Sequence, residues 1–225
     1  MTRVTKQTLR CFWGGAAAAM VLGAAPLQAA VLSVHVANSG QPLPDAVVTA
    51  VAHAQVAEPR SNRAHPNAVM LQQNQQFEPF VLPIQVGTTV QFPNHDPFRH
   101  HVYSFSPAKS FELKLYGGDR TETVTFDKTG IVALGCNIHD NMLAYIDVVD
   151  TPYFAKTDSN GNAVIADLPA GTYTITLWHP DQGTQKAPSQ NVTLSADAKT
   201  KLDLASDFKR ERRQRPARPV DESAY

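Results

Sequence analysis

Short runs of β-branched and aromatic residues, each ended by glycine, proline, asparagine or aspartate, follow one another between residues 31 and 204. Helical periodicity is nearly absent over the same range. Runs such as 122–126 and 172–178 alternate in polarity, which predicts half-buried strands. Many short strands separated by turn residues are typical of a β-sandwich. The chain is therefore predicted to be all-β.

The N-terminal segment has the three parts of a secretory signal. Basic residues within the first ten precede an apolar, alanine-rich stretch over 12–25, and Gln28-Ala29-Ala30 supplies small residues for cleavage near Ala29 or Ala30. The apolar stretch is too short to span a membrane, and no lipoprotein motif precedes Cys11. We interpret residues 1–30 as the signal peptide of an exported, periplasmic protein without a membrane anchor. An uncleaved anchor or a buried helix is the alternative.

Charge argues against one class of partner. The chain has 20 basic and 20 acidic residues, and removal of the signal leaves 17 basic residues, a net charge of −3. Residues 206–225 carry six basic and four acidic residues, which predicts a basic, disordered tail. The body before that tail has 11 basic and 16 acidic residues. Nucleic acid is therefore not the expected partner.

A single cysteine remains once the signal, which contains Cys11, is removed. A lone thiol in an oxidising compartment is unusual, and must be buried, paired between chains, catalytic or metal-bound. The run Cys136-Asn137-Ile138-His139-Asp140-Asn141-Met142 places an imidazole and a thioether at intervals of three. A thiolate, two imidazoles and a weak thioether form a mononuclear electron-transfer copper site. The run therefore predicts three copper ligands. A buried cysteine with incidental neighbours is the alternative.

The second imidazole must come from outside that run. Segment 92–102 offers His100 and His101, and His95 is expected on a surface loop. Adjacent side chains of a strand point to opposite faces, so only one of the pair is expected to reach the ion. A thioether ligand favours copper over zinc.

Three motifs lie in the order Gly87-Thr88-Thr89-Val90-Gln91-Phe92-Pro93-Asn94, His100-His101-Val102, and Gly130 with Cys136 six residues on. With them, segment 92–149 resembles the cupredoxin family of blue copper proteins. The resemblance implies a Greek-key β-sandwich with one type 1 copper. It also makes His100 the fourth ligand and puts His101 at the family's asparagine position. The ligand set expected is therefore His100, Cys136, His139 and Met142.

The spacing of the cysteine loop is most similar to amicyanin- and pseudoazurin-type sites. Ile138 stands where the family often has proline, and Gly135 stands where an aromatic residue often precedes the cysteine. The runs 92–94, 100–104 and 134–140 also resemble exported cupredoxin-domain proteins of the methylamine utilization subgroup. That likeness implies a link to amine oxidation.

The flanking segments carry a second resemblance. Gly40-Gln41-Pro42-Leu43-Pro44-Asp45-Ala46, and later the turns at 157–161 and 168–173, are similar to a small carboxypeptidase-regulatory-like β-sandwich of transthyretin-like or Ig-like type. We expect residues 31–57 and 151–205 to form this sandwich, split by a cupredoxin domain at 66–150. The alternative is that residues 31–54 add strands to a single sandwich.

These features favour a periplasmic electron carrier with a redox partner such as a cytochrome, a dehydrogenase or an oxidase, and with His139 as the electron port. A copper maturation or delivery protein, and a structural sandwich with a vestigial site, are the alternatives. An enzyme is not expected. A multicopper oxidase needs more paired histidines than His100-His101, a thiolate-bridged dinuclear centre needs a second cysteine, and cysteine–histidine catalysis needs an oriented third group.

Overall fold

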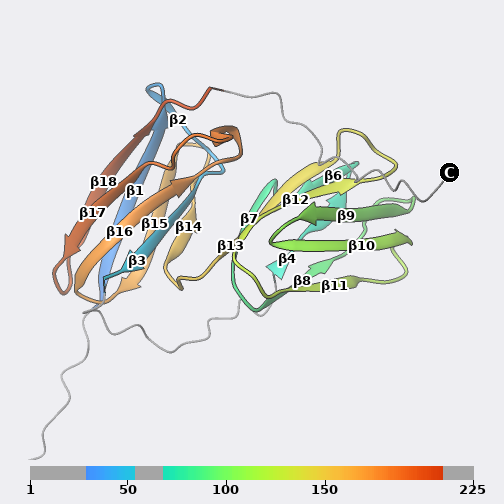
Figure 1. The fold of residues 1–225 in the computed structure, drawn as a ribbon, viewed down its shortest axis with the longest axis horizontal. Coiled ribbons are helices and arrows are strands. Elements are labelled where there is room, and N and C mark those ends of the chain that lie inside the picture. Colours follow the sequence, from blue (N-terminus) through green and yellow to red (C-terminus); the bar gives the residue numbers. More distant parts are fainter. Residues whose placement is uncertain (1–28, 54–67, 210–225) are drawn as a thin grey trace, which may run out of the picture.

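The computed structural model describes residues 29–53 and 68–209 (Figure 1). These residues form strands β1 to β18 and one short 3-10 helix, η1 (Pro180–Gln182), and they contain no α-helix. The all-β class predicted from the sequence is confirmed. Most of the predicted signal peptide, the segment 54–67 and the tail beyond residue 209 lie outside the described residues. Within the described ranges, no helix is long and apolar enough to cross a membrane.

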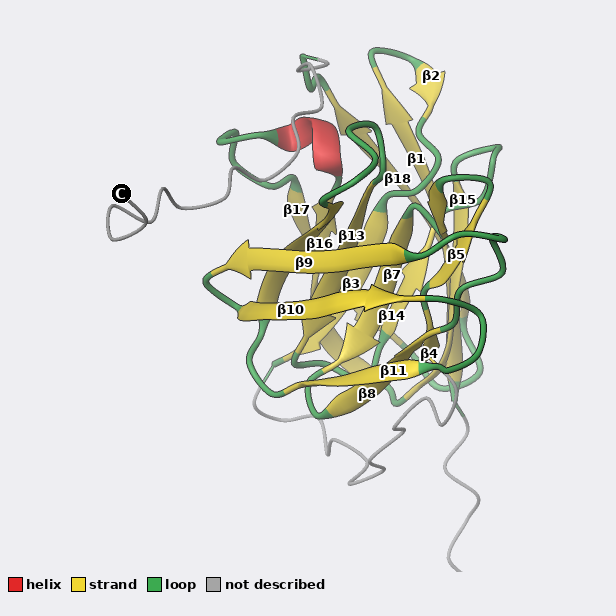
Figure 2. Ribbon diagram, turned by 90° about the vertical axis from the view of Figure 1, so that its right-hand side faces the viewer, coloured by secondary structure: helices red, strands yellow, loops and turns green. Residues whose placement is uncertain are grey.

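The middle of the chain forms one β-sandwich, called here the inserted sandwich (residues 68–149). Its strands are β4 (Ala68–Val69), β5 (Leu71–Gln73), β6 (Gln76–Glu78), β7 (Val81–Gln85), β8 (Thr88–Phe92), β9 (His100–Ser106), β10 (Lys109–Tyr116), β11 (Glu122–Phe126), β12 (Gly130–Cys136) and β13 (Leu143–Val149). One sheet has the order β10-β9-β12-β13-β7, the other has the order β11-β8-β4, and β5 and β6 form a hairpin. In Figure 2, β9 and β10 run side by side, with β11 and β8 below them.

The two ends of the described chain build the second unit, called here the split sandwich (residues 30–52 and 154–206). Its strands are β1 (Ala30–Asn38), β2 (Gln41–Pro42), β3 (Val47–Ala52), β14 (Phe154–Lys156), β15 (Asn162–Leu168), β16 (Gly171–Trp178), β17 (Ser189–Leu194) and β18 (Lys199–Ser206). The sheets have the orders β15-β1-β18, with β2 paired to β1, and β14-β3-β16-β17. Strands β1 and β18 are parallel neighbours. Figure 1 shows the split sandwich, in blue and orange to red, beside the inserted one.

Each sandwich has its own hydrophobic core, because alternate residues of its strands point inward. In β1 every second residue from Ala30 to Val36 is buried. The split sandwich's core joins side chains of β1, β3, β15, β16 and β18, including Leu32 and Leu177, with Tyr153 from the segment before β14. The core of the inserted sandwich joins a separate set that includes Phe92, Val102, Leu134, Cys136 and Met142. Cys136 and Met142, two of the metal-ligand candidates, thus belong to the core of the inserted sandwich.

The sandwiches meet along β13. Tyr145 of β13 and Trp178 of β16 make an edge-to-face ring contact, with ring centroids 5.8 Å apart. Asp147, two residues on, is buried and lines a pocket at this junction together with Thr49 and Trp178. Burial raises the pKa of Asp147 from its usual 3.8 to about 7. A titratable carboxyl therefore lies where the two units touch.

Candidate metal centre

Cys136 is the last residue of β12 and is fully buried. It lies opposite Val102 of the neighbouring strand β9. The next residue, Asn137, donates its backbone N–H to the carbonyl oxygen of His101 at 3.1 Å. The thiol therefore stands at the end of a hydrogen-bonded strand rather than on a free loop.

His100 begins β9 and is fully buried. It lies two residues before Val102, so its side chain points to the same sheet face as Val102 does. Its Nδ1 is 3.7 Å from Sγ of Cys136. Its Nε2 is 2.8 Å from Oδ2 of Asp96. The ring is thus held between a thiol on one side and a carboxylate on the other.

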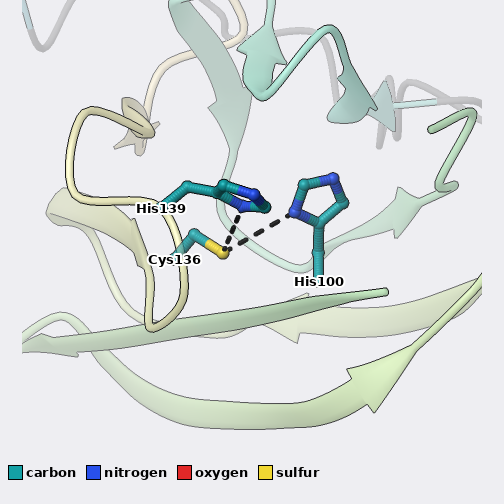
Figure 3. A group of neighbouring side chains, drawn as sticks. All are labelled: His100, Cys136 and His139. Carbon is teal, nitrogen blue, oxygen red and sulfur yellow. Dashed lines mark hydrogen bonds between the residues drawn. The ribbon is translucent and has the colours of Figure 1, made fainter. Parts of the chain in front are cut away.

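His139 reaches the same sulfur from the loop that follows β12. Its Nδ1 is 3.7 Å from Sγ of Cys136, and its ring is half-buried. Figure 3 shows the two imidazoles approaching the sulfur from different segments, with both contacts drawn as dashed lines. The ligand atoms of His100, Cys136 and His139 all lie within 4.8 Å of one another.

Met142 is fully buried and belongs to the same core cluster as Cys136. Its backbone N–H donates to the carbonyl oxygen of His139 at 3.1 Å, which closes a turn in the loop. This turn brings the chain from the half-buried His139 back into the core within three residues. The loop therefore presents an imidazole at its rim and a thioether inside.

His101, the other candidate for the second imidazole, faces away from the cluster. Its Nε2 lies 2.8 Å from Oε1 of Glu112 on the adjacent strand β10. Of the histidine pair, the structure thus brings His100 to Cys136 and His101 to a carboxylate. His95 is exposed and lies in the loop before β9.

The imidazole rings of His100 and His139 contact each other and the ring of Phe98. The ring centroids of His100 and His139 are 4.9 Å apart. Phe98 lies 5.3 Å from the first ring and 5.4 Å from the second. Phe98 and Ile138 are partly exposed, 38% and 48% respectively, so the half-buried edge of His139 has apolar neighbours at the surface.

Burial and hydrogen bonding shift the pKa of His100 in opposite directions. Burial lowers its pKa below the usual value, although the hydrogen bond to Asp96 and the charge of that carboxylate act to raise it. A lowered pKa favours the neutral ring, which is the form that binds metals. Burial alone would raise the pKa of Asp96, but hydrogen bonds from Gln75, His100 and Asn74 hold it below its usual value.

The donor set fits one soft metal ion. Metal–nitrogen and metal–sulfur bonds are roughly 2.0 and 2.3 Å long. Sulfur–nitrogen separations of 3.7 Å are shorter than the sum of two such bonds, so one ion can contact the sulfur together with either imidazole. A thiolate with two imidazoles and a buried thioether nearby suits copper, whereas a thioether is not an ordinary zinc ligand.

Sequence reasoning missed two residues at this site. Tyr103 of β9 lies opposite Gly135 and is buried. Asp96 contacts His100 and is nearly buried, with a side chain 7% exposed. A carboxylate four residues before a histidine ligand is a usable signal, since ligand histidines commonly donate their second N–H to a carboxylate. Tyr103 had no comparable signal, because its position depends on how β9 pairs with β12.

The chain is similar to solved cupredoxin structures at low sequence identity. A purple cupredoxin from Nitrosopumilus maritimus is 22% identical over 36% of this chain and 99% of that chain, with a TM-score of 0.34. A reduced amicyanin variant is 20% identical over 45% of this chain and 99% of that chain, also with a TM-score of 0.34. A copper-containing nitrite reductase from Thermus scotoductus SA-01 is 25% identical over 52% of this chain and 28% of that chain, with a TM-score of 0.35.

Residues 129–202 match the family model described as polysaccharide lyase family 4, domain II. The match runs from β12 and β13 of the inserted sandwich into the C-terminal part of the split one. None of the curated proteins matches the chain.

Proposed function

We propose that this chain is a mononuclear, type 1 copper protein that carries electrons. The observation that carries the proposal is the position of Cys136 Sγ, which lies 3.7 Å from Nδ1 of His100 and 3.7 Å from Nδ1 of His139. The buried thioether of Met142 supplies the fourth donor of this kind of site.

Bound copper would supply a one-electron couple. The protein's part is to hold the donors and keep water away. Cys136 and His100 are fixed on paired strands, and both are fully buried with Met142. His139 is the donor with an exposed edge, so we propose it as the route for electrons to and from a partner.

The wider role is part of the same proposal. We place the protein in the periplasm, after cleavage of residues 1–30, with a redox partner such as a cytochrome, a dehydrogenase or an oxidase and no catalysis of its own. The likeness of its motifs to the methylamine utilization subgroup supports a link to amine oxidation. The two separate cores support a cupredoxin domain at 66–150, inserted into a second sandwich of residues 31–57 and 151–205.

Visible and electron paramagnetic resonance spectra of the protein loaded with Cu(II) test the proposal. Intense thiolate-to-copper absorption, a type 1 resonance signal and a reversible potential are the expected results. Cys136→Ser should lose the absorption band, and His101→Ala should keep it. A colourless protein with an ordinary tetragonal signal would contradict the type 1 assignment.

The same samples separate the alternatives. A delivery protein would prefer Cu(I), exchange it rapidly with a chelator and form no stable blue state. A structural sandwich would hold the same amount of copper with or without the sulfur of Cys136.

A further inference from the structure

Asp96 joins three segments of the inserted sandwich. Its Oδ2 accepts from Nε2 of His100 at 2.8 Å and from the backbone N–H of Gln75 at 3.0 Å. Its Oδ1 accepts from the backbone N–H of Asn74 at 2.7 Å. Its own N–H donates to Oδ1 of Asn94 at 2.9 Å. One carboxylate therefore ties the start of β9, the loop before it and the β5–β6 hairpin together.

The turn of the β5–β6 hairpin directs the backbone N–H groups of Asn74 and Gln75 toward Asp96. Asn74 and Gln75 connect β5 and β6, and both have positive φ, at 54° and 59°. Two central residues with positive φ are typical of a type I′ turn. Both N–H groups of this turn converge on Asp96. The loop is held from its other side by Asn94, whose Nδ2 donates to the carbonyl oxygens of Phe98 and Tyr116 at 2.8 and 3.1 Å.

The contact decides which nitrogen of His100 carries the proton. An ionised carboxylate only accepts hydrogen bonds, so the hydrogen between it and the ring belongs to Nε2. In the neutral ring the lone pair then lies on Nδ1. That is the nitrogen 3.7 Å from the sulfur of Cys136. Asp96 thus selects the tautomer whose free nitrogen faces the other donors.

The two clustered histidines differ in this respect. Within residues 29–53 and 68–209, the hydrogen bonds and ion pairs found for His139 include no carboxylate, and its ring contacts are with Cys136, Phe98 and His100. The support from Asp96 is specific to the buried histidine.

We propose that Asp96 is a positioning residue that makes His100 an Nδ1 donor and couples the β5–β6 hairpin to the metal centre. The inference rests on the proposed copper function, because it assigns the means by which one proposed ligand is oriented. The hairpin at 71–78 supplies no ligand itself, but through Asp96 it helps to hold His100 in position.

The test compares Asp96→Ala and Asp96→Asn with the wild-type protein and with Glu112→Gln. The last variant is a matched control, because Glu112 lies 2.8 Å from Nε2 of His101, the neighbouring histidine that faces away from the cluster. Asp96→Asn is included because it keeps one acceptor oxygen, whereas Asp96→Ala also frees two turn N–H groups. Long-range ¹⁵N–¹H correlation spectra of the metal-free proteins report the tautomer of each histidine. Competition with a Cu(I) chelator reports affinity.

The wild-type protein and Glu112→Gln should hold His100 with the proton on Nε2. Asp96→Ala should show both tautomers of His100 and bind Cu(I) about 10- to 100-fold more weakly, the usual cost of losing such a partner. Asp96→Asn should give a smaller change in the same direction. An unchanged tautomer and an affinity within about twofold of wild type, in whichever of the two Asp96 variants folds, would overturn the inference. Failure of the wild-type protein to bind copper would overturn the proposed function instead, and the tautomer measurement would still decide the role of Asp96.

Discussion

The ring of Tyr103 covers Gly135, the residue immediately before Cys136. The two residues face each other on the paired strands β9 and β12. A Cβ atom added to Gly135 would lie 2.7 Å from Cζ and 2.8 Å from Oη of Tyr103. The ring of Tyr103 on β9 thus fills the space that a side chain at position 135 of β12 would otherwise occupy.

Gly135→Ala should therefore destabilise the protein, because a buried ring must move. Overpacking of this kind costs roughly 1–3 kcal/mol. The measurement is the free energy of unfolding in guanidinium chloride, together with the visible spectrum of the copper-loaded protein. Gly117→Ala is the control, since its added Cβ would come no nearer than 3.3 Å to any atom, the side-chain oxygen of Asp119.

A double-mutant cycle with Tyr103→Leu tests the cause. The cost of Gly135→Ala should shrink when the ring is absent. Equal costs in the two backgrounds would show that the ring is not the obstacle.

The variants His100→Ala and His101→Ala should differ clearly in copper binding. The first removes the imidazole whose Nδ1 lies 3.7 Å from Cys136, and the second removes one that lies 2.8 Å from Glu112. We expect the type 1 resonance signal to be lost in His100→Ala and kept in His101→Ala. Copper stoichiometry and electron paramagnetic resonance spectra are the readouts. Similar spectra from the two variants would refute the assignment of His100.

The buried carboxyl of Asp147 should make stability fall as pH rises. Its pKa is raised from 3.8 to about 7, so between these values the native state keeps a proton that the unfolded state has lost. The free energy of unfolding therefore decreases from about pH 4 to pH 7 and stays lower above that range. At 1.36 kcal/mol per pKa unit, the loss from this group is at most about 4 kcal/mol.

Asp147→Asn should remove this decrease in the free energy of unfolding with rising pH. Relative to the wild-type protein, the variant should gain stability at pH 8 and show little gain at pH 4, as measured by urea unfolding at both values. Asp127→Asn serves as the exposed control, because Lys109 holds the pKa of Asp127 below its usual value and the variant should gain nothing at pH 8. A gain for Asp147→Asn that is the same at both pH values would contradict the prediction.

Gly161→Ala should damage the split sandwich and spare the metal centre. Gly161 has φ of +74°, and an added Cβ would lie 2.4 Å from the carbonyl oxygen of Val36. Gly40 has a similar φ of +78° with nothing within 4 Å of its added Cβ, so Gly40→Ala should cost only the conformational strain, roughly 1–2 kcal/mol. The clash should add roughly 1–3 kcal/mol in Gly161→Ala.

Fluorescence of Trp178 reports unfolding of the split sandwich, and the copper spectrum reports the inserted one. We expect Gly161→Ala to shift the first transition and leave the spectrum unchanged. A changed copper spectrum would mean that the two cores do not act separately.

Strands with strong alternation and turn residues at both ends could be predicted closely. The strand expected at 122–126 is found as β11 (Glu122–Phe126), and the one expected at 172–178 is found one residue longer, as β16 (Gly171–Trp178). β14 (Phe154–Lys156) was missed, because three residues after Pro152 carry no period of their own. Its extended form comes from pairing with β3, where Phe154 lies opposite Thr49.

The same distinction holds at the candidate site. Cys136 and His139 could be selected from sequence because their side-chain chemistry suits a metal, and His100 could be selected over His101 through the resemblance to cupredoxins. The structure brings the three together. Tyr103 could be recognised only once the pairing of β9 with β12 was seen to place it opposite Gly135. Residues whose role depends on a contact between distant segments leave no pattern within a short window of sequence.

The parallel pairing of β1 with β18 sets an order for events during synthesis. Val31 lies opposite Lys199, and Asn38 lies opposite Ser206, so the first strand described gains this neighbour only after residue 206 has left the ribosome. All ten strands of the inserted sandwich emerge earlier, between residues 68 and 149. The inserted sandwich, which holds Cys136, can thus fold while β1 and β3 are still unpaired. Unpaired strands are prone to aggregate, so the nascent chain most needs protection at this stage.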